Sequence, residues 1–504
     1  MINCKITSKK IFDLKADCFV FFLEQDFTFS KELKFIEDNL FSGLRSYIKI
    51  NKFNGGAKSS LLIPISTDSD ITNILLVGLG KHDKKKKSAI ENLRRAVGTV
   101  IRTAEKRSCR SIAIQMPPFT FFGVKGDYLA KQISSILHIA CYHFDSFITD
   151  KERKLKHEFD VMLVVKEKDK TSVARGIKQG EVIGNAVNKS RCWVDLPPSK
   201  LTPVALADEA KQIAKKQNLK ITVFDEKKVN ELSMGGLSAV SRGSERDCRF
   251  VAVEYRSNKK GAPTIALVGK GVTFDAGGLS LKPAAYMENM KEDMSGAAVV
   301  FAAIDALATL KPDVNILAVA ALAENLPSGK ALMPGDIVTF YNGKTAEVKN
   351  TDAEGRLILA DALSYVVKHY KPDAIIDLAT LTGACQYALG PFFCGMMSKH
   401  DDLAQKVQKA AELSGDRVWA LPFDDDYKPA IKSSVADICN IGSKQYMAGA
   451  ITAGFFLQNF VGDVPWVHLD IAGTSFDVPD ISYLRQGATG FGVRLLVELI
   501  LNWK

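Results

Sequence analysis

The chain has 504 residues, more than one ordinary hydrophobic core can serve, so two or three domains are expected. With 46% hydrophobic and 25% charged residues, the composition is globular and excludes a disordered or fibrous protein. The net charge is +10, but its location matters more than its size. Residues 1–170 hold 30 of the 67 Lys and Arg and 20 of the 57 Asp and Glu, so 37 of each sign remain beyond residue 170 and balance.

The basic excess therefore lies in the N-terminal third, and its densest point is the run Lys84–Lys87. A lysine run of this kind is typical of a solvated loop, and the alternative is an anionic partner such as nucleic acid. We keep nucleic-acid binding by this region as the alternative hypothesis.

The nine cysteines are scattered and form no CxxC pair, which argues against a disulfide framework or a cysteine zinc site and indicates a reducing compartment. The first residues do not form a secretory signal. Asp305 interrupts the longest alanine-rich stretch, so we expect no membrane span. These observations predict a cytoplasmic protein.

Residues 1–165 predict a small α/β domain. Helical spacing is found at Ala89–Lys106 and Asp127–His143. The turn Gly78-Leu79-Gly80 lacks the third glycine of a dinucleotide-binding fingerprint and is a weak signal. The runs of strand length are Cys18–Leu23, Ser60–Ile65, Ile71–Val77, Ile112–Gln115 and Val161–Val165.

Residues 166–190 predict a linker helix, and residues 191–504 a larger C-terminal α/β domain. Thr202-Pro203 is well suited to begin a helix. Buried helices are expected at Ser295–Leu310 and Leu357–His369. They alternate with buried strands, which predicts a mostly parallel central sheet between helices. The expected strands are Phe250–Tyr255, Thr264–Val268, Asn315–Ala321 and Ala374–Ala379.

Three polar clusters lie where such sheets bind ligands, at strand ends or helix starts. The first is a glycine-rich turn after a strand, with Lys270, Asp275 and, beyond it, Lys282. The second, KEDMSG, contains Asp293, and the third is NTDAEGRL, residues 350–357. Taken singly, these carboxylates are consistent with turn and helix-cap residues, and Lys270 with a surface lysine.

Taken together, the clusters predict a site for two divalent cations, because such sites need several convergent carboxylates. None of the seven histidines lies inside them, so the site is either not a metal site of the zinc type or is built from carboxylates and a lysine. A lysine ligates a metal only as the neutral amine, the form that a neighbouring dication favours.

The segments VGKGVTFDAGGLSLKP, MKEDMSGAA and NTDAEGRLILADAL closely resemble, in content and order, the signature blocks of the leucine aminopeptidase (cytosol aminopeptidase) family, in a bacterial-type member. The resemblance runs from about Asp195 to the end and includes GAITAG (449–454). It implies a metal-dependent exopeptidase that releases leucine and similar residues from short peptides. It also implies a homohexamer.

Carried over residue by residue, the resemblance implies two ions, Mn²⁺ or Zn²⁺ among the metals that the family uses, and a bicarbonate as general base. Lys282 would stabilise the oxyanion, and Arg356 would hold the bicarbonate. GSKQYM (442–447) departs from the usual bacterial pattern, so the side-chain preference stays open. The implied metal ligands are Lys270, Asp275, Asp293, Asp352 and Glu354, and the implied substrate pocket is Met290, Thr380, Leu381, Gly383 and Ala453.

Overall fold

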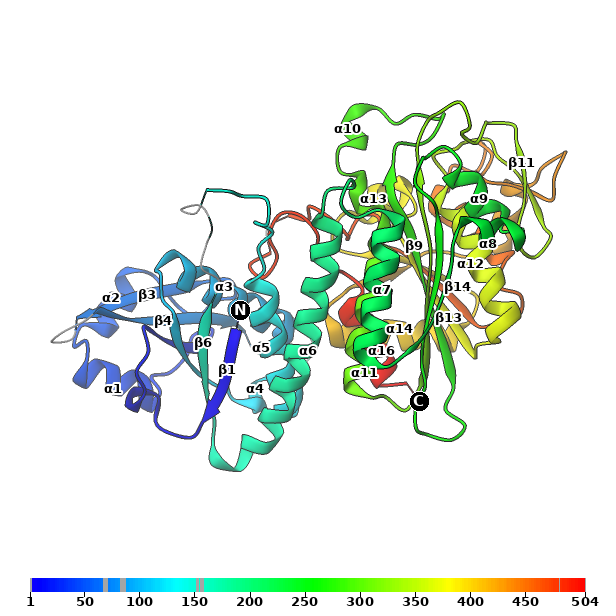
Figure 1. The fold of residues 1–504 in the computed structure, drawn as a ribbon. Helices are drawn as coiled ribbons and strands as arrows, with labels where there is room; N and C mark the ends of the chain where they lie inside the picture. Colours follow the sequence, from blue (N-terminus) through cyan, green and yellow to red (C-terminus); the bar gives the residue numbers. More distant parts are fainter. Residues whose placement is uncertain are drawn as a thin grey trace. The chain divides into compact units, whose positions relative to one another are not determined.

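The computed structural model describes residues 2–66, 71–81, 88–150, 154, 158–479 and 481–503 (Figure 1). The chain forms two compact units, Met1–Asn188 with Asp480–Arg485, and Lys189–Pro479 with Gln486–Lys504. Helix α6 (Lys170–Asp195) runs from one unit into the other without a break. The predicted domain boundaries, residues 1–165, 166–190 and 191–504, stay a prediction. They do not foresee that residues 480–485 belong to the first unit. The run Lys84–Lys87 lies outside the described residues.

The first unit is built on a six-stranded sheet in the order β1-β6-β5-β2-β4-β3, in which only β3 is antiparallel to its neighbour. Helices α3 and α5 pack together on one face, and α1 and α2 cover the apolar side chains of β2 and β3. The elements are β1 (Ile2–Thr7), β2 (Cys18–Glu24), α1 (Lys31–Asn39), α2 (Leu44–Ile50), β3 (Ser60–Ser66), β4 (Ile71–Gly80), α3 (Ser88–Lys106), β5 (Ser111–Gln115), α4 (Phe119–Phe122), α5 (Gly126–Ala140) and β6 (Phe159–Val164).

The first part of α6 packs closely against α5 through a stripe of glycines. A Cβ atom on Gly176 would lie 2.1 Å from the carbonyl oxygen of Asp127, and one on Gly180 would lie 2.5 Å from that of Lys131. Because no side chain intervenes, the two helix backbones approach one another directly.

The second unit contains an eight-stranded sheet in the order β15-β14-β17-β13-β9-β10-β8-β7. Its four central strands are mutually parallel, which confirms the predicted mostly parallel sheet. The strands are β7 (Lys220–Phe224), β8 (Arg249–Tyr255), β9 (Thr264–Asp275), β10 (Asn315–Asn325), β13 (Ala374–Ala379), β14 (Cys394–Ser398), β15 (Val418–Ala420) and β17 (Trp466–Asp470).

Helices cover both faces of this sheet (Figure 1). One layer contains α7 (Pro203–Gln217), α11 (Ser295–Leu310), α14 (Asp401–Ser414) and α16 (Val493–Leu501), and the other α9 (Gly235–Ser241), α12 (Gly355–Tyr370) and α15 (Gly449–Gln458). A smaller sheet joins β11 (Ile337–Thr339), β12 (Thr345–Glu347) and β16 (Ile438–Cys439). The remaining short helices are α8 (Glu226–Glu231), α10 (Ala284–Met287) and α13 (Gly383–Leu389).

Helix α11 is almost wholly apolar, and its N-cap is Met294. Within the described residues, the stretch Ala284–Leu310 is long and apolar enough to cross a membrane, contrary to our expectation, but 89% of its apolar window is buried inside the protein. Such burial is what the core helix of a folded domain shows. Asp305, which we expected to interrupt the apolar stretch, forms a half-buried ion pair with Lys189 at 2.9 Å.

Candidate metal centre

Strand β9 carries two of the predicted ligands. We expected it to end at Val268 and to run into a glycine-rich turn, which is wrong, because the strand continues to Asp275. Its glycines serve close packing: a Cβ atom on Gly269 would lie 2.4 Å from the carbonyl oxygen of Gly296. Lys270 therefore lies inside a central strand and is only 3% exposed, so the surface-lysine interpretation is wrong.

Asp275 ends β9, next to a register shift in the pairing of β9 with β10. Its Oδ1 accepts hydrogen bonds from the backbone of Gly277 at 2.9 Å and from Asn325 Nδ2 at 2.8 Å. The first bond is the turn contact that a structural aspartate would make. The other carboxylate oxygen of Asp275, Oδ2, forms an ion pair with Lys282, whose Nζ lies 2.9 Å away.

Asp293 and Glu354 lie at helix starts, yet neither side chain makes a capping hydrogen bond. The N-cap position of α11 is Met294 and that of α12 is Glu354, and neither helix start has a side-chain cap hydrogen bond. Both carboxylates are buried. The simple capping interpretation of Asp293 and Asp352 therefore does not account for them.

Asp275, Asp293 and Glu354 form a group in which one carboxylate oxygen of each lies within 4.8 Å of one oxygen of each of the others. Lys270 Nζ lies 2.7 Å from Asp293 Oδ1 and 2.8 Å from Glu354 Oε1, and it donates to the carbonyl oxygen of Thr380 at 2.8 Å. Gly355 makes room for this lysine, since a Cβ atom there would lie 2.4 Å from its Cε. Lys270 thus holds one side of the group together.

Lys282 holds the other side. Its Nζ lies 2.9 Å from Asp275 Oδ2 and 2.5 Å from Asp352 Oδ1. Asp352 is the most open of the five predicted ligands, with 31% of its side chain exposed. The structure therefore brings all five predicted ligands and Lys282 into one site.

Burial and mutual repulsion dominate the electrostatics. Burial raises the pKa of Asp275 to about 7, and neighbouring Glu354 adds to the rise. Burial also raises the pKa of Asp293 well above its ordinary value, although Lys270 opposes this. For Glu354, the attraction of Lys270 and Lys282 outweighs burial and lowers the pKa. The two lysines therefore favour the ionised carboxylates, but they outweigh burial only at Glu354.

The group fits divalent cations. Asp293 Oδ2 is buried and has no hydrogen-bond partner among the residues that the structure describes. Taking a carboxylate out of water costs several kcal/mol per ion unless a cation compensates it. Oxygen-rich sites of this kind suit divalent metals, and Lys270 can join them once it loses its proton.

Arg356 lies on the first turn of α12, is 6% exposed and donates to the carbonyl oxygen of Asn440 at 2.7 Å. Burial lowers its pKa to about 10. It lines a cavity of about 280 Å³ that is also lined by Asp352, Leu381, Gly383 and Thr452. Within the described part of the chain its Nε has no hydrogen-bond partner, so the cavity has a buried donor to offer an anion.

The predicted substrate residues are distributed unevenly. Leu381 and Gly383 line the Arg356 cavity, and Thr380 donates through Oγ1 to Asp293 Oδ1 at 2.8 Å. Met290 begins the short helix before α11. Ala453 is fully buried in α15, and its neighbour Thr452 reaches the cavity instead.

Sequence reasoning missed three supporting residues. Asn325, at the end of β10, binds Asp275, and Asn440 holds Arg356. Asp470 accepts hydrogen bonds from the backbone of Leu381 at 3.2 Å and from Thr382 Oγ1 at 2.6 Å, and so fixes the loop that carries Thr380. Asn325 and Asp470 both end strands of the central sheet, which is the signal that could have found them.

Comparison with known proteins agrees with this geometry. Residues 188–497 match the cytosol aminopeptidase family, catalytic domain, and residues 20–151 match its N-terminal domain. The chain belongs to the cytosol aminopeptidase family. The resemblance found in the signature blocks is thus confirmed, and it extends to the N-terminal third. Membership identifies the protein as a metal-dependent aminopeptidase, a hydrolase of peptides.

Individual members of the family are similar over almost their whole length. A probable cytosol aminopeptidase of Roseiflexus castenholzii is 40% identical over 93% of this chain and 94% of its own, and one of Chlorobaculum tepidum is 39% identical over the full length of both. Among solved structures, a mutant of tomato leucine aminopeptidase has a TM-score of 0.88 with 31% identity, covering 99% of this chain and 96% of that one. The bottromycin maturation enzyme BotP in complex with Mn has a TM-score of 0.84 with 31% identity, covering 97% and 99%.

Proposed function

We propose that this aminopeptidase removes leucine and similar apolar residues from the N-termini of short peptides, using two divalent ions. The observation that carries the proposal is the convergence of three buried carboxylates within 4.8 Å of one another, with buried Lys270 in ion-pair contact with two of them. Such a group of buried carboxylates is costly unless a bound cation compensates it.

Asp275 and Glu354 would be shared by both ions, Lys270 and Asp293 would complete one site, and Asp352 the other. When bound, such ions act as Lewis acids and bring the pKa of a water molecule towards neutrality. The manganese of the BotP structure favours Mn²⁺ as one candidate, with Zn²⁺ as the other.

Lys282 would stabilise negative charge on the carbonyl oxygen of the scissile bond. It is already aimed at the site by Asp275 and Asp352, and burial, which alone would lower its pKa, is outweighed by these carboxylates, so the pKa is raised. These contacts favour the ammonium form of Lys282. A donor held in place before the reaction needs no reorganisation during it.

Arg356 would hold a bicarbonate that accepts the proton of the attacking water. Its burial, its free Nε and the cavity beside it support this role. No histidine lies among the metal-centre residues, so a bound anion supplies the base that the side chains lack.

The selectivity for apolar side chains is assigned to the pocket of Met290, Thr380, Leu381, Gly383 and Ala453. The proposal also includes assembly as a homohexamer and a cytoplasmic location. The location is supported by the free cysteines and by the printed names of the relatives. Light scattering of the purified protein tests the assembly, with about six chains per particle as the expected result.

The direct test is hydrolysis of leucine p-nitroanilide before chelation, after chelation and after metal is restored. We expect activity to disappear and to return. An N-acetylated leucyl dipeptide should resist hydrolysis, whereas the free dipeptide is cleaved. Full activity after complete metal removal, or equal cleavage of the blocked peptide, would contradict the proposal.

The basic N-terminal third supports nucleic-acid binding only through its charge, and we retain it as the second candidate. Binding of this kind weakens steeply with added salt. A gel shift of duplex DNA at low salt, compared with a variant in which Lys84–Lys87 are replaced by glutamine, tests it. Absence of a shift, or an unchanged shift in the variant, would exclude this role.

A further inference from the structure

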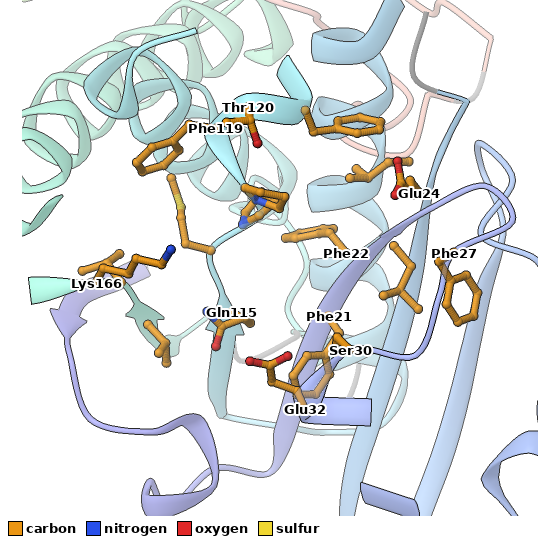
Figure 2. Close-up of a pocket in the computed structure, with 18 of the residues that line it drawn as sticks. Phe21, Phe22, Glu24, Phe27, Ser30, Glu32, Gln115, Phe119, Thr120 and Lys166 are labelled. Carbon is orange, nitrogen blue, oxygen red and sulfur yellow. The ribbon is translucent and has the colours of Figure 1, made fainter. Parts of the chain in front are cut away.

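A cleft of about 770 Å³ opens in the first unit at the carboxyl ends of four parallel strands, β2, β4, β5 and β6 (Figure 2). Each of these strands contributes a lining residue at or next to its carboxyl end, namely Glu24, Leu79, Gln115 and Val165. The volume is within the range of about 300–1,000 Å³ that is usual for small-molecule sites.

The cleft lies where the topology of the sheet predicts a ligand. Strands β2 and β5 are neighbours, but the chain leaves them in opposite directions. After β2 it passes through α1 and α2 to β3 at one edge, and after β5 it passes through α4 and α5 to β6 on the other side. The two connections diverge and leave a crevice between them, which is the usual binding place in open α/β sheets.

One wall of the cleft is apolar. The side chains of Phe22 from β2 and Phe119 from α4 face the cleft (Figure 2). Met116 and Pro117 also belong to the lining. Phe119 is only partly buried, so it presents open apolar surface. A bulky hydrocarbon group would be taken out of water against this wall.

The opposite part of the cleft carries one group of each charge. In Figure 2, Lys166, Gln115 and Glu32 face a common space below the aromatic side chains. The acidic neighbour of Lys166, Glu167, is paired with Lys170 at 2.8 Å. Among the residues that the structure describes, no ion pair involves Lys166 or Glu32, so both remain available to a ligand.

We propose that this cleft binds a free amino acid with a bulky apolar side chain. Lys166 takes the α-carboxylate, Glu32 takes the α-ammonium group, and Phe22 and Phe119 pack against the side chain. This cleft is a different site from the metal centre, and the inference does not rest on the proposed function. The amino acid released by the proposed aminopeptidase reaction would belong to the same chemical class as this ligand.

A phosphorylated ligand fits the cleft less well, because three carboxylates, Glu24, Glu32 and Asp169, line it against two lysines. The segment Gly78-Leu79-Gly80, which was predicted as a turn, forms the end of strand β4 and borders the cleft through Leu79, so it is not a phosphate loop. A Cβ atom on Gly78 would lie 2.1 Å from the carbonyl oxygen of Gly56, so glycine is needed there for packing against another loop.

Hydrogen exchange of the full-length, metal-replete enzyme, followed by mass spectrometry with and without L-leucine, tests the proposal segment by segment. We expect slower exchange in residues 20–32, 115–121 and 164–169. The slowing should be about tenfold at a leucine concentration ten times the dissociation constant. Leucine bound at the metal centre is reported separately by residues 350–357, so failure of either site is distinguished from failure of the other.

Three variants locate the ligand. Lys166→Ala and Glu32→Gln should each abolish the protection of the cleft segments, whereas Lys178→Ala, an exposed lysine of α6 outside the lining, should keep it. Because neither target has an ion pair among the described residues, both variants should fold, and their melting temperatures check this. 3-Methylbutylamine, which lacks the carboxylate, and 4-methylpentanoate, which lacks the ammonium group, should protect weakly, and neither has a bond that an aminopeptidase can cleave.

The proposal is overturned if leucine does not protect the cleft segments of the wild type. It is also overturned if Lys166→Ala and Glu32→Gln retain full protection, or if both analogues protect as well as leucine.

Discussion

The metal centre of the second unit and the cleft of the first both lie at carboxyl ends of parallel strands, yet their charges are handled in opposite ways. At the metal centre, Lys270, Asp275 and Glu354 are each at most 3% exposed. In the cleft, Lys166 is exposed and Glu32 is half-exposed. The charged side chains at the carboxyl ends of the parallel strands are therefore buried in the second unit and exposed to solvent in the first.

This difference in solvent exposure determines how strongly each site can bind a charged ligand. Buried charges repel one another strongly and fix a bound cation, whereas exposed charges are screened by water and bind weakly and reversibly. We expect substitutions at the metal centre to change catalysis by orders of magnitude. Substitutions in the cleft should leave basal catalysis almost unchanged.

The largest effect is expected for Glu354→Ala. It removes a carboxylate from the buried group and leaves Lys270 with one partner fewer. We expect the variant to lose bound metal and at least about 10³-fold in kcat, since metal chemistry and orientation fail together. Glu231→Ala, a surface glutamate, is the matched control and should behave as wild type. A Glu354→Ala enzyme with normal metal content and turnover would contradict the assignment.

Lys282→Met should lower kcat by about 10²- to 10³-fold, the usual effect of losing a preorganised oxyanion donor. Metal content should change little, because Lys282 contacts the carboxylates but is not assigned as a ligand. Metal analysis of the purified variant separates the two roles. If metal is lost in proportion to activity, Lys282 is a structural counter-ion rather than a catalytic residue.

Arg356→Ala should lower turnover by about 10²-fold, the lower range for loss of a general base, with metal content retained. Added bicarbonate should stimulate the wild type and not the variant. Arg417→Ala, an exposed arginine of the same unit, is the control. Loss of metal in Arg356→Ala would show instead that the arginine supports the ligands.

A smaller effect, on stability and dependent on pH, is expected from a buried histidine in the central sheet of the second unit. His468 is fully buried, and its Nδ1 lies 2.6 Å from Asp377 Oδ1. Burial alone would lower its pKa, but Asp377 outweighs burial and raises it above 6.5. The charged pair therefore stabilises the fold fully below about pH 6.5, and this contribution is lost as the pH rises through the folded-state pKa.

His468→Gln should accordingly destabilise the protein by about 3 kcal/mol at pH 6, as expected for breaking a buried pair, and by less at pH 9. Melting curves of wild type and variant at both pH values measure the gap, with His400→Gln as control. An equal gap at both pH values would mean that His468 does not change its protonation state between them, which would contradict this prediction.

The smallest effect is expected for Lys166→Ala, which should leave leucine p-nitroanilide hydrolysis within about twofold of wild type, because surface charges contribute little. Initial rates at low substrate and without added leucine measure this. A large loss of basal activity would mean that the contrast between the two sites is wrong.

The sequence predicts the buried parts of the fold well. Helix α11 and strand β13 begin and end where their apolar runs predict, because an element buried on both sides is apolar throughout. Strand β9 was predicted too short, since its glycines are typical of a turn. Only the close approach of the first turn of α11, at Gly296, explains why a glycine lies inside this strand.

The residues of the two sites could likewise be predicted mainly where they are buried. Lys270, Asp275 and Glu354 could be predicted because several charges stand beside apolar runs, where they are costly to bury. Asn325 and Asn440 could not, because their roles depend on contacts between segments far apart in the chain. The cleft was not predicted for the same reason: its lining comes from four strand ends, and none of its charges is costly when exposed.

The most direct test of the metal centre is a count of metal ions in the purified full-length protein. Metal analysis of wild type and Glu354→Ala, with leucine p-nitroanilide hydrolysis measured on the same samples, joins occupancy to activity. We predict about two divalent ions per chain in the wild type, with the loss of metal on chelation matched by the loss of activity. An active wild-type enzyme that contains no divalent metal would contradict the account.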